Sequence, residues 1–197
     1  YGIPQFVNLV LIFMNLDALA EEGIDPETID PGNWEQLQDL GEQLHVMEGS
    51  NVVRTGFDTK VQDGRLWLWS WANGVDLISP DGTQANFADP AVIEALTWAK
   101  ETVDRQGGEQ ARAAFAQTQN FFSPQNPVLI GQTAITVFEQ WLIGVMKVNP
   151  EANFRAMLPR MRNSEENLTD ATGAAFAIPR GISGAARDSA WSFIKGM

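Results

Sequence analysis

The chain has 197 residues, enough for one large domain or two small ones with a substantial core. Hydrophobic residues make up 44% and charged residues 19%, a composition typical of globular rather than disordered proteins. A net charge of −12 repels phosphate backbones, so we expect no nucleic-acid partner. The absence of cysteine excludes disulfides, thiol nucleophiles and cysteine-bound zinc. The longest apolar run, residues 6–14, is interrupted by Asn8 and is too short to cross a bilayer.

The first sixty residues alternate between strand-like and helix-like patterns. Asn33 is a favourable N-cap, and Gln36 three residues later predicts a capping box. Leu37, Leu40 and Leu44 recur at helical spacing and predict one apolar helix face. The expected elements are a buried strand over 1–15, a short helix ended by Gly23, a polar loop over 25–33, a helix from Trp34 to about Met47, and a strand over 52–59.

The segment RLWLWSWANG, residues 65–74, places three tryptophans at alternate positions. A strand would put all three on one face. Asp63 as an N-cap and Asn73-Gly74 as a C-terminal stop favour a helix instead. In a helix, Trp67 and Trp71 lie one turn apart on one face, while Trp69 points elsewhere. A Trp pair at this spacing is usually core, but three buried indoles would each need a partner for the N–H group, so the pattern leaves open whether one of them lines a cleft.

The remaining two thirds of the chain again mix both patterns. Asp89 and Pro90 predict the start of a helix that ends near Gln106, with Val92, Leu96 and Val103 as its apolar stripe. The other expected elements are a turn over 79–82 between two extended runs, a helix over 111–117, a strand over 133–138, a helix from about Glu139 to 148, a strand over 154–159, a polar loop over 160–170, a strand over 173–179, and a helix over 183–197.

Catalytic motifs are scarce. His45 is the single histidine and falls on a predicted helix, so we interpret it as a packed or surface side chain. No Ser/His/Asp triad, His-based metal cluster or glycine-rich phosphate loop can be assembled. A glycosidase needs only two carboxylates, and Glu139 beside Trp141, or Asp63, would be the candidates for that alternative. We expect no catalytic residue, cofactor or metal.

An ordered series of motifs carries a resemblance. It runs from YGIPQF (1–6) through NWEQLQDLGEQL (33–44) and NGVDLISPDGTQANFADPAVIEALTW (73–98) to GQTAITVFEQWLIG (131–144). In this order the chain resembles the extracellular solute-binding proteins of ABC sugar importers, the family that includes maltose-binding protein. The resemblance spans nearly the whole chain but only about the middle half of a family member, which makes this a partial chain.

The resemblance implies an α/β fold, namely a periplasmic-binding-protein-like (type II) lobe with a mixed sheet flanked by helices. It implies four segments along the chain. These are a hinge crossover (1–4), the second lobe (5–157), a hinge return with a polar loop (158–169), and a strand and helix that resemble part of the first lobe (170–197).

The resemblance also implies a function. Members hold a solute, here a carbohydrate or related polyol, between two lobes that close around it, and then dock on the membrane subunits of an ABC importer. That role places the protein outside the cytoplasm, in the periplasm or tethered to the outer face of the cell membrane. The implied ligand-binding residues are Asn8, Asp63, Arg65, Trp67, Trp71, Glu139 and Trp141. This chain departs from the family where Glu139-Gln140 replaces a common Gly-Pro.

Two other classes of protein remain open. One is the carbohydrate-active hydrolase using Glu139 or Asp63. The other is a structural or interaction domain in which every tryptophan is core. We also expect some self-association through apolar surface of the last strand and helix.

Overall fold

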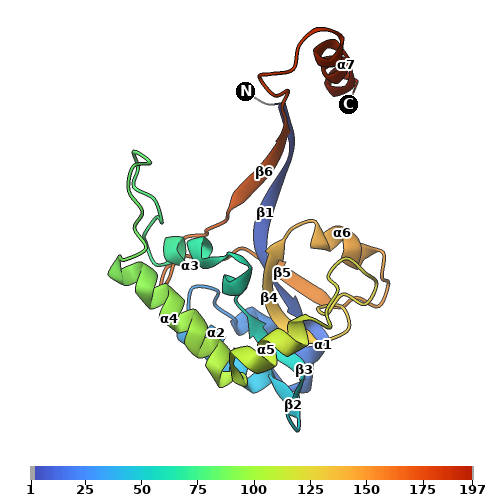
Figure 1. The fold of residues 1–197 in the computed structure, drawn as a ribbon. Coiled ribbons are helices and arrows are strands. Elements are labelled where there is room, and N and C mark those ends of the chain that lie inside the picture. Colours follow the sequence, from blue (N-terminus) through green and yellow to red (C-terminus); the bar gives the residue numbers. More distant parts are fainter. Residues whose placement is uncertain (1–2, 197) are drawn as a thin grey trace. The chain divides into compact units, whose positions relative to one another are not determined.

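The computed structural model describes residues 3–196, except for the side chains of residues 171 and 172. Contacts between residues divide the chain into two units, and β1 (Ile3–Asn15) and β6 (Ala171–Phe176) are both labelled in Figure 1. Unit 2 comprises residues Val10–Thr169, and unit 1 combines Tyr1–Leu9 with Asp170–Met197. Residues 158–169, expected as a hinge return, therefore group with unit 2. The assignment of these units to the lobes of a longer protein stays a prediction.

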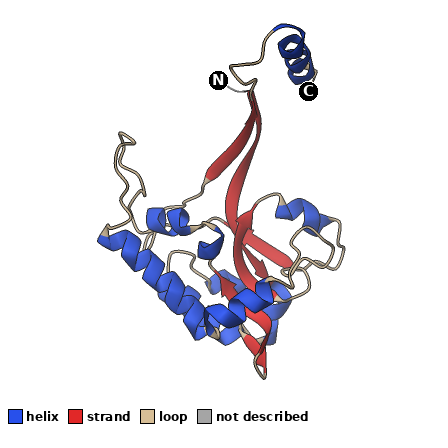
Figure 2. Ribbon diagram, in the orientation of Figure 1, coloured by secondary structure: helices blue, strands red, loops and turns tan. Residues whose placement is uncertain are grey.

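Unit 2 is built on a mixed sheet with helices packed against it (Figure 2). The strand order is β2-β3-β4-β1-β5, in which β3 is parallel to β4 and the other neighbours are antiparallel. The strands are β1 (Ile3–Asn15, of which Val10 onward lies here), β2 (Val46–Glu48), β3 (Asn51–Asp58), β4 (Thr133–Glu139) and β5 (Phe154–Met157). The predicted α/β fold class with a mixed sheet and flanking helices is confirmed.

The helices of unit 2 follow the expected order along the chain. They are α1 (Leu16–Glu21), the 3₁₀ turns η1 (Pro26–Thr28) and η2 (Val61–Asp63), α2 (Trp34–Leu44), α3 (Leu66–Ala72), α4 (Pro90–Arg105), α5 (Gly108–Ala116) and α6 (Leu142–Lys147). Helices α2, α4 and α5 lie together on one side of the sheet (Figure 1). Helices α2 and α5 contact β3, and α4 contacts both α2 and α5.

Strand β1 separates two hydrophobic cores. Its side chains alternate between the two faces of the sheet, as the period of a strand requires. Ile12 and Met14 enter the larger core, which α2, α3 and α4 cover, whereas Phe13 enters a smaller core with Leu142 and Met146 of α6. All five of these side chains are fully buried, which explains the continuous apolar run that the sequence displays here.

Helix α2 packs closely on β3 because two glycines meet there. A Cβ atom added to Gly56 would lie 1.9 Å from the carbonyl oxygen of Gly41. Beside this contact, the buried side chain of Gln106 accepts hydrogen bonds from the backbone N–H groups of Gly56 and Phe57, and its Nε2 donates to the Phe57 carbonyl. Backbone contact thus holds α2 on β3, and the Gln106 amide, at the end of α4, ties that helix to the same strand.

Several sequence-based expectations for the ends of helices are corrected. Helix α2 ends at Leu44 rather than near Met47, because residues 46–48 pair with β3 as a strand. His45 is thus the C-cap of α2 and not a helical residue. The capping box is only half formed: Asn33 accepts from the Gln36 N–H, but the Gln36 side chain accepts from Asp30 instead.

Two other helices also differ from expectation. Leu96 was predicted in the apolar stripe of α4 but is 47% exposed, because the buried face runs through Val92, Ala95, Ala99 and Val103. Helix α6 begins at Leu142 rather than near Glu139, because Glu139 is still paired to Val10 as the last residue of β4.

Unit 1 contains a two-stranded ribbon and a helix. The first half of β1 pairs antiparallel with β6 (Ala171–Phe176), from Ile3 opposite Phe176 to Leu9 opposite Ala171. Helix α7 (Gly184–Lys195) follows, and Phe193 makes an edge-on contact with Phe176. Phe6, Trp191 and Phe193 are each between 46% and 64% exposed, so this unit has extensive apolar surface of its own.

Candidate functional site

The candidate site lies where β3 and β4 end. These neighbouring strands are parallel, so their carboxyl ends meet at one edge of the sheet. The chain after β3 forms η2 and enters α3 at Leu66, and the chain after β4 leads through Trp141 into α6. Loops at such an edge are a usual place for ligand sites in α/β proteins. Residues more than seventy positions apart in the sequence are brought together there.

An ion pair joins the two loops directly. The guanidinium of Arg65, at the start of α3, contacts the carboxylate of Glu139, at the end of β4. The side chains are 15% and 18% exposed, so the pair is shielded but reachable from solvent. Two of the residues that the resemblance implies as ligand contacts thus touch each other.

The tryptophans of α3 divide as the helical interpretation predicted. Trp67 and Trp71 lie on one face with ring centroids 4.9 Å apart, and both are half-buried. The Arg65 guanidinium lies 5.5 Å from the Trp67 ring, within cation–π range. Trp69 points to the other side, is fully buried, and donates its indole N–H to the Thr59 carbonyl at 2.8 Å. Trp69 is therefore a core residue, whereas Trp67 packs against the core with one side and stays partly exposed.

Asp63 does not cap α3, contrary to the sequence-based expectation. It lies within η2, Arg65 occupies the N-cap position of α3, and the Asp63 carboxylate is 3.1 Å from the Lys60 ammonium. Because the 3₁₀ turn η2 precedes α3, the helix begins only at Leu66, and the Asp63 side chain pairs with Lys60 instead of capping the helix. The helix itself is confirmed, over Leu66–Ala72.

Lys60 is a site feature that the sequence analysis missed. Its backbone is left-handed at φ 57°, a conformation that non-glycine residues rarely adopt and that recurs at functional sites. Its ammonium also pairs with Asp58 at 2.9 Å and lies 4.3 Å from the Phe121 ring. Burial acts to lower the pKa of Lys60, but Asp58 and Asp63 together outweigh it, so the pKa lies above its ordinary value. Lys60 is therefore a permanent cation whose charge is already balanced.

Trp141 belongs to a group of stacked rings, most of which the sequence analysis also missed. Phe122 stacks on Trp141 with centroids 5.1 Å apart and planes 10° apart, and Phe138 meets Trp141 edge-on at 5.1 Å. Phe121 stacks in turn on Phe138 at 4.8 Å. Phe122 is 80% exposed, which is unusual for so large an apolar side chain. The adjacent Phe121-Phe122 pair was the only sequence signal, and its spacing does not indicate that it meets Trp141.

We call the six residues of these contacts the aromatic face. The Arg65–Glu139 ion pair joins the segment that carries the Trp67–Trp71 pair to the loop after β4, which carries Trp141 and its stacked Phe122. Its members are Arg65, Trp67, Trp71, Phe122, Glu139 and Trp141. Asn8 is not among them: it lies in β1 opposite Thr172, within unit 1, and its role as a ligand contact stays a prediction.

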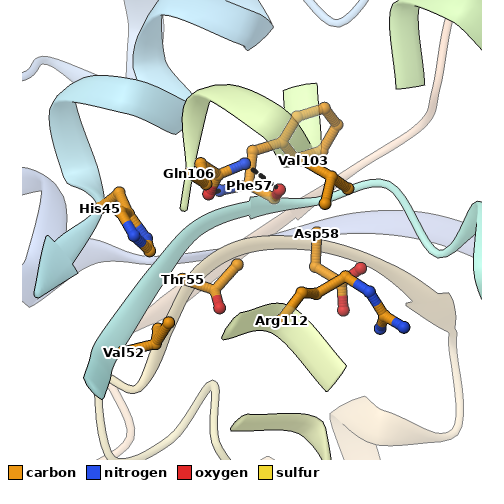
Figure 3. A pocket seen from close by; sticks show the side chains of 8 residues that line it. All are labelled: His45, Val52, Thr55, Phe57, Asp58, Val103, Gln106 and Arg112. Atoms are coloured by element: carbon orange, nitrogen blue, oxygen red, sulfur yellow. Dashed lines mark hydrogen bonds between the residues drawn. The ribbon is translucent and has the colours of Figure 1, made fainter. Parts of the chain in front are cut away.

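A second feature of unit 2 is a small cavity between α2, β3, α4 and α5 (Figure 3). His45, Thr55, Asp58, Gln106 and Arg112 supply its polar lining. Within the described part of the chain, neither ring nitrogen of His45 has a hydrogen-bond partner. Burial lowers the pKa of His45, and the nearby Arg54 backbone opposes this only in part. None of the sequence-predicted site residues lines this cavity, and we interpret it as a packing feature.

Two further observations concern metal ligands and membrane-spanning helices among the described residues, 3–196. No group of three His, Asp or Glu side chains in that range is close enough to hold a metal ion. None of the helices in it is both long and apolar enough to span a bilayer.

Comparison with known proteins identifies the family. The family model described as "Bacterial extracellular solute-binding protein" matches residues 1–195, and the chain belongs to this family. Its members are described as binding proteins, not as enzymes. No curated protein matches the sequence.

Solved structures confirm the fold. CpMnBP1, solved with mannobiose bound, has a TM-score of 0.83 at 22% identity over 100% of this chain and 49% of its own. Lmo0181 from Listeria monocytogenes, an ABC substrate-binding protein in complex with cycloalternan, has a TM-score of 0.78 at 17% identity over 98% of this chain and 46% of its own. UgpB from Mycobacterium tuberculosis, in complex with glycerophosphocholine, has a TM-score of 0.71 at 18% identity over 98% and 46%. The chain thus spans about half the length of these relatives.

Proposed function

We propose that this chain is part of a receptor that binds a carbohydrate outside the cytoplasm and delivers it to the membrane subunits of an ABC importer. The observation that carries the proposal is the aromatic face, in a chain whose family consists of extracellular solute-binding proteins. Relatives solved with mannobiose and cycloalternan support a sugar as the ligand.

The chemistry of a sugar fits this surface. A pyranose ring has apolar C–H faces that pack on aromatic rings, and hydroxyl groups at its edge that need hydrogen-bond partners. Trp67, Trp71, Phe122 and Trp141 offer the rings. Arg65 offers N–H donors and Glu139 offers acceptor oxygens.

Delivery requires the receptor to have a different conformation when the sugar is bound, so that the importer can distinguish the two states. In the proposed mechanism the lobe formed by unit 2 and a second lobe close around the ligand. A ligand that contacts both lobes favours the closed state, because only differential affinity shifts such an equilibrium. Asn8 is a proposed polar contact, and the importer subunits recognise the closed form.

Binding is favoured over hydrolysis by the state of the two candidate carboxylates. Glu139 contacts Arg65 and Asp63 contacts Lys60. Each carboxylate is thus already paired with a cation of the protein, and neither is paired with the other, whereas a glycosidase needs two carboxyl groups that flank the scissile bond. The purely structural alternative required every tryptophan to be core, yet Trp67, Trp71 and Trp141 are only half-buried and Trp191 is 46% exposed.

The test is a tryptophan-fluorescence titration of the protein at its full natural length with a panel of mono- and disaccharides. We expect a saturable change with at least one sugar. Trp67→Ala and Trp141→Ala should each weaken binding about tenfold or more, as the loss of a stacking ring does. Trp191→Ala, an exposed tryptophan outside the aromatic face, is the matched control. No saturable change with any sugar, or equal losses in all three variants, would overturn the proposal.

A further inference from the structure

The charged groups of the aromatic face are balanced within the protein. Arg65 is paired with Glu139, and Lys60 beside it is paired with Asp58 and Asp63. Arg65 and Glu139 are each less than one-fifth exposed, so water screens their attraction less than it would on an open surface. A ligand arriving here meets an existing ion pair rather than an unpaired cation.

An uncharged ligand can use this pair without separating it. The guanidinium has five N–H donors and the carboxylate has several acceptor positions, so both can bond hydroxyl groups while they remain in contact. The Arg65 guanidinium lies 5.5 Å from the Trp67 ring, and Glu139 is two residues from Trp141. Hydroxyl groups of a sugar packed on Trp67 are therefore near the ion pair.

An anionic ligand meets the opposite situation. A phosphate or carboxylate must share the Arg65 guanidinium with Glu139 while it approaches the Glu139 negative charge. Like charges in a shielded site repel strongly, and displacing Glu139 leaves a poorly solvated charge without its partner. Such a repulsive element is a common basis of specificity.

We propose that Glu139, by holding Arg65, restricts this site to uncharged solutes and rejects those that carry a carboxylate or phosphate. This inference rests on the proposed function and deepens it, since it gives the substrate class as neutral glycans. Glu139 acts here as a specificity-determining residue, and no proton transfer is assigned to it.

The experiment compares matched neutral and anionic probes. Maltose, cellobiose and mannobiose are each titrated beside the corresponding uronic acid, which keeps both pyranose rings and carries one carboxylate in place of a hydroxymethyl group. The proteins are wild type, Glu139→Gln and Glu94→Gln, each at full natural length, with binding measured by calorimetry. Glu94→Gln removes the carboxylate partner of Arg162 elsewhere in unit 2, so it changes the net charge equally. A double variant, Glu139→Gln with Arg65→Gln, tests whether any acid binding gained depends on Arg65.

We expect the wild type to bind at least one neutral disaccharide about tenfold or more tightly than its acid. Glu139→Gln should reduce this preference about tenfold, Glu94→Gln should leave it unchanged, and the double variant should lose the acid binding that Glu139→Gln gains. Equal binding of both probes by the wild type, or an unchanged preference in Glu139→Gln, overturns this inference and leaves the proposed receptor function standing. No binding of any probe by any variant overturns both.

Discussion

Trp69 and Trp67 are two positions apart on α3 but have opposite environments, and replacing each with alanine separates core from site. Trp69 is fully buried, meets Trp34 and Phe57 edge-on with centroids 6.0 Å away in each case, and donates to the Thr59 carbonyl. Trp67 is half-buried and has Trp71 as its ring partner. The same substitution therefore removes very different amounts of packing.

The magnitudes follow from these contacts. Truncating a buried tryptophan costs about 3–5 kcal/mol. Trp69→Ala should fall in the upper part of that range, because the contacts with the Trp34, Phe57 and Trp98 rings and one hydrogen bond are lost with it. Trp67→Ala loses one aromatic pair, worth about 0.5–1.5 kcal/mol, and part of its burial. We expect the two free energies of unfolding to differ by about 2 kcal/mol or more.

Urea unfolding monitored by far-ultraviolet circular dichroism measures both values. Trp69→Phe is a useful companion, because it keeps most of the apolar volume but leaves the Thr59 carbonyl without its donor, at a cost of about 1–3 kcal/mol. If Trp67→Ala destabilised the fold as much as Trp69→Ala, the assignment of Trp67 to a binding surface would be wrong.

Three further predictions concern the rest of the molecule. Gly56→Ala should destabilise unit 2 by about 2–3 kcal/mol, because its Cβ would collide with the Gly41 carbonyl. Gly144→Ala, which has open space around its Cβ, should be neutral or stabilising. Thermal unfolding of both variants measures the two effects, and equal effects would contradict this prediction. Burial holds the pKa of His45 below its ordinary value of 6.5, so its contribution to stability is full above that value and declines as the pH falls below it. His45→Gln should accordingly lose less stability than wild type between about pH 7.5 and pH 5.5, and equal losses would contradict this. Residues 1–197 alone should self-associate through the exposed rings of unit 1, which a strictly monomeric light-scattering profile at high concentration would refute.

Local patterns were sufficient for most of the fold. The N-caps Asn33 and Asp89 and the apolar run of β1 act within a few residues, and the structure has helices and a strand at these places. The sequence-based predictions were wrong where pairing with a strand distant in the sequence determines the local structure. Residues 46–48 leave α2 to pair with β3, and Glu139 stays in β4 because it pairs with Val10. Leu96 is exposed because the side of α4 that faces α2 and α3 runs through Ala95, Trp98 and Ala99 instead.

The candidate site was only partly accessible to sequence reasoning. Trp67, Trp71 and Trp141 were recognisable from helical spacing and from the resemblance. The Arg65–Glu139 contact depends on the parallel pairing of β3 and β4, which brings together two loops over seventy residues apart. Lys60 and Phe122 gave no usable signal, because a left-handed backbone and a stacked ring in a long loop are products of tertiary structure.

The most direct test of the account is to follow the indole N–H resonances of the seven tryptophans by ¹H–¹⁵N NMR while a neutral disaccharide is added to the full-length protein. The binding account predicts saturable shifts for Trp67, Trp71 and Trp141, and much smaller ones for the buried Trp34, Trp69 and Trp98. Saturable binding that left Trp67, Trp71 and Trp141 unmoved would contradict the assignment of the aromatic face as the ligand site.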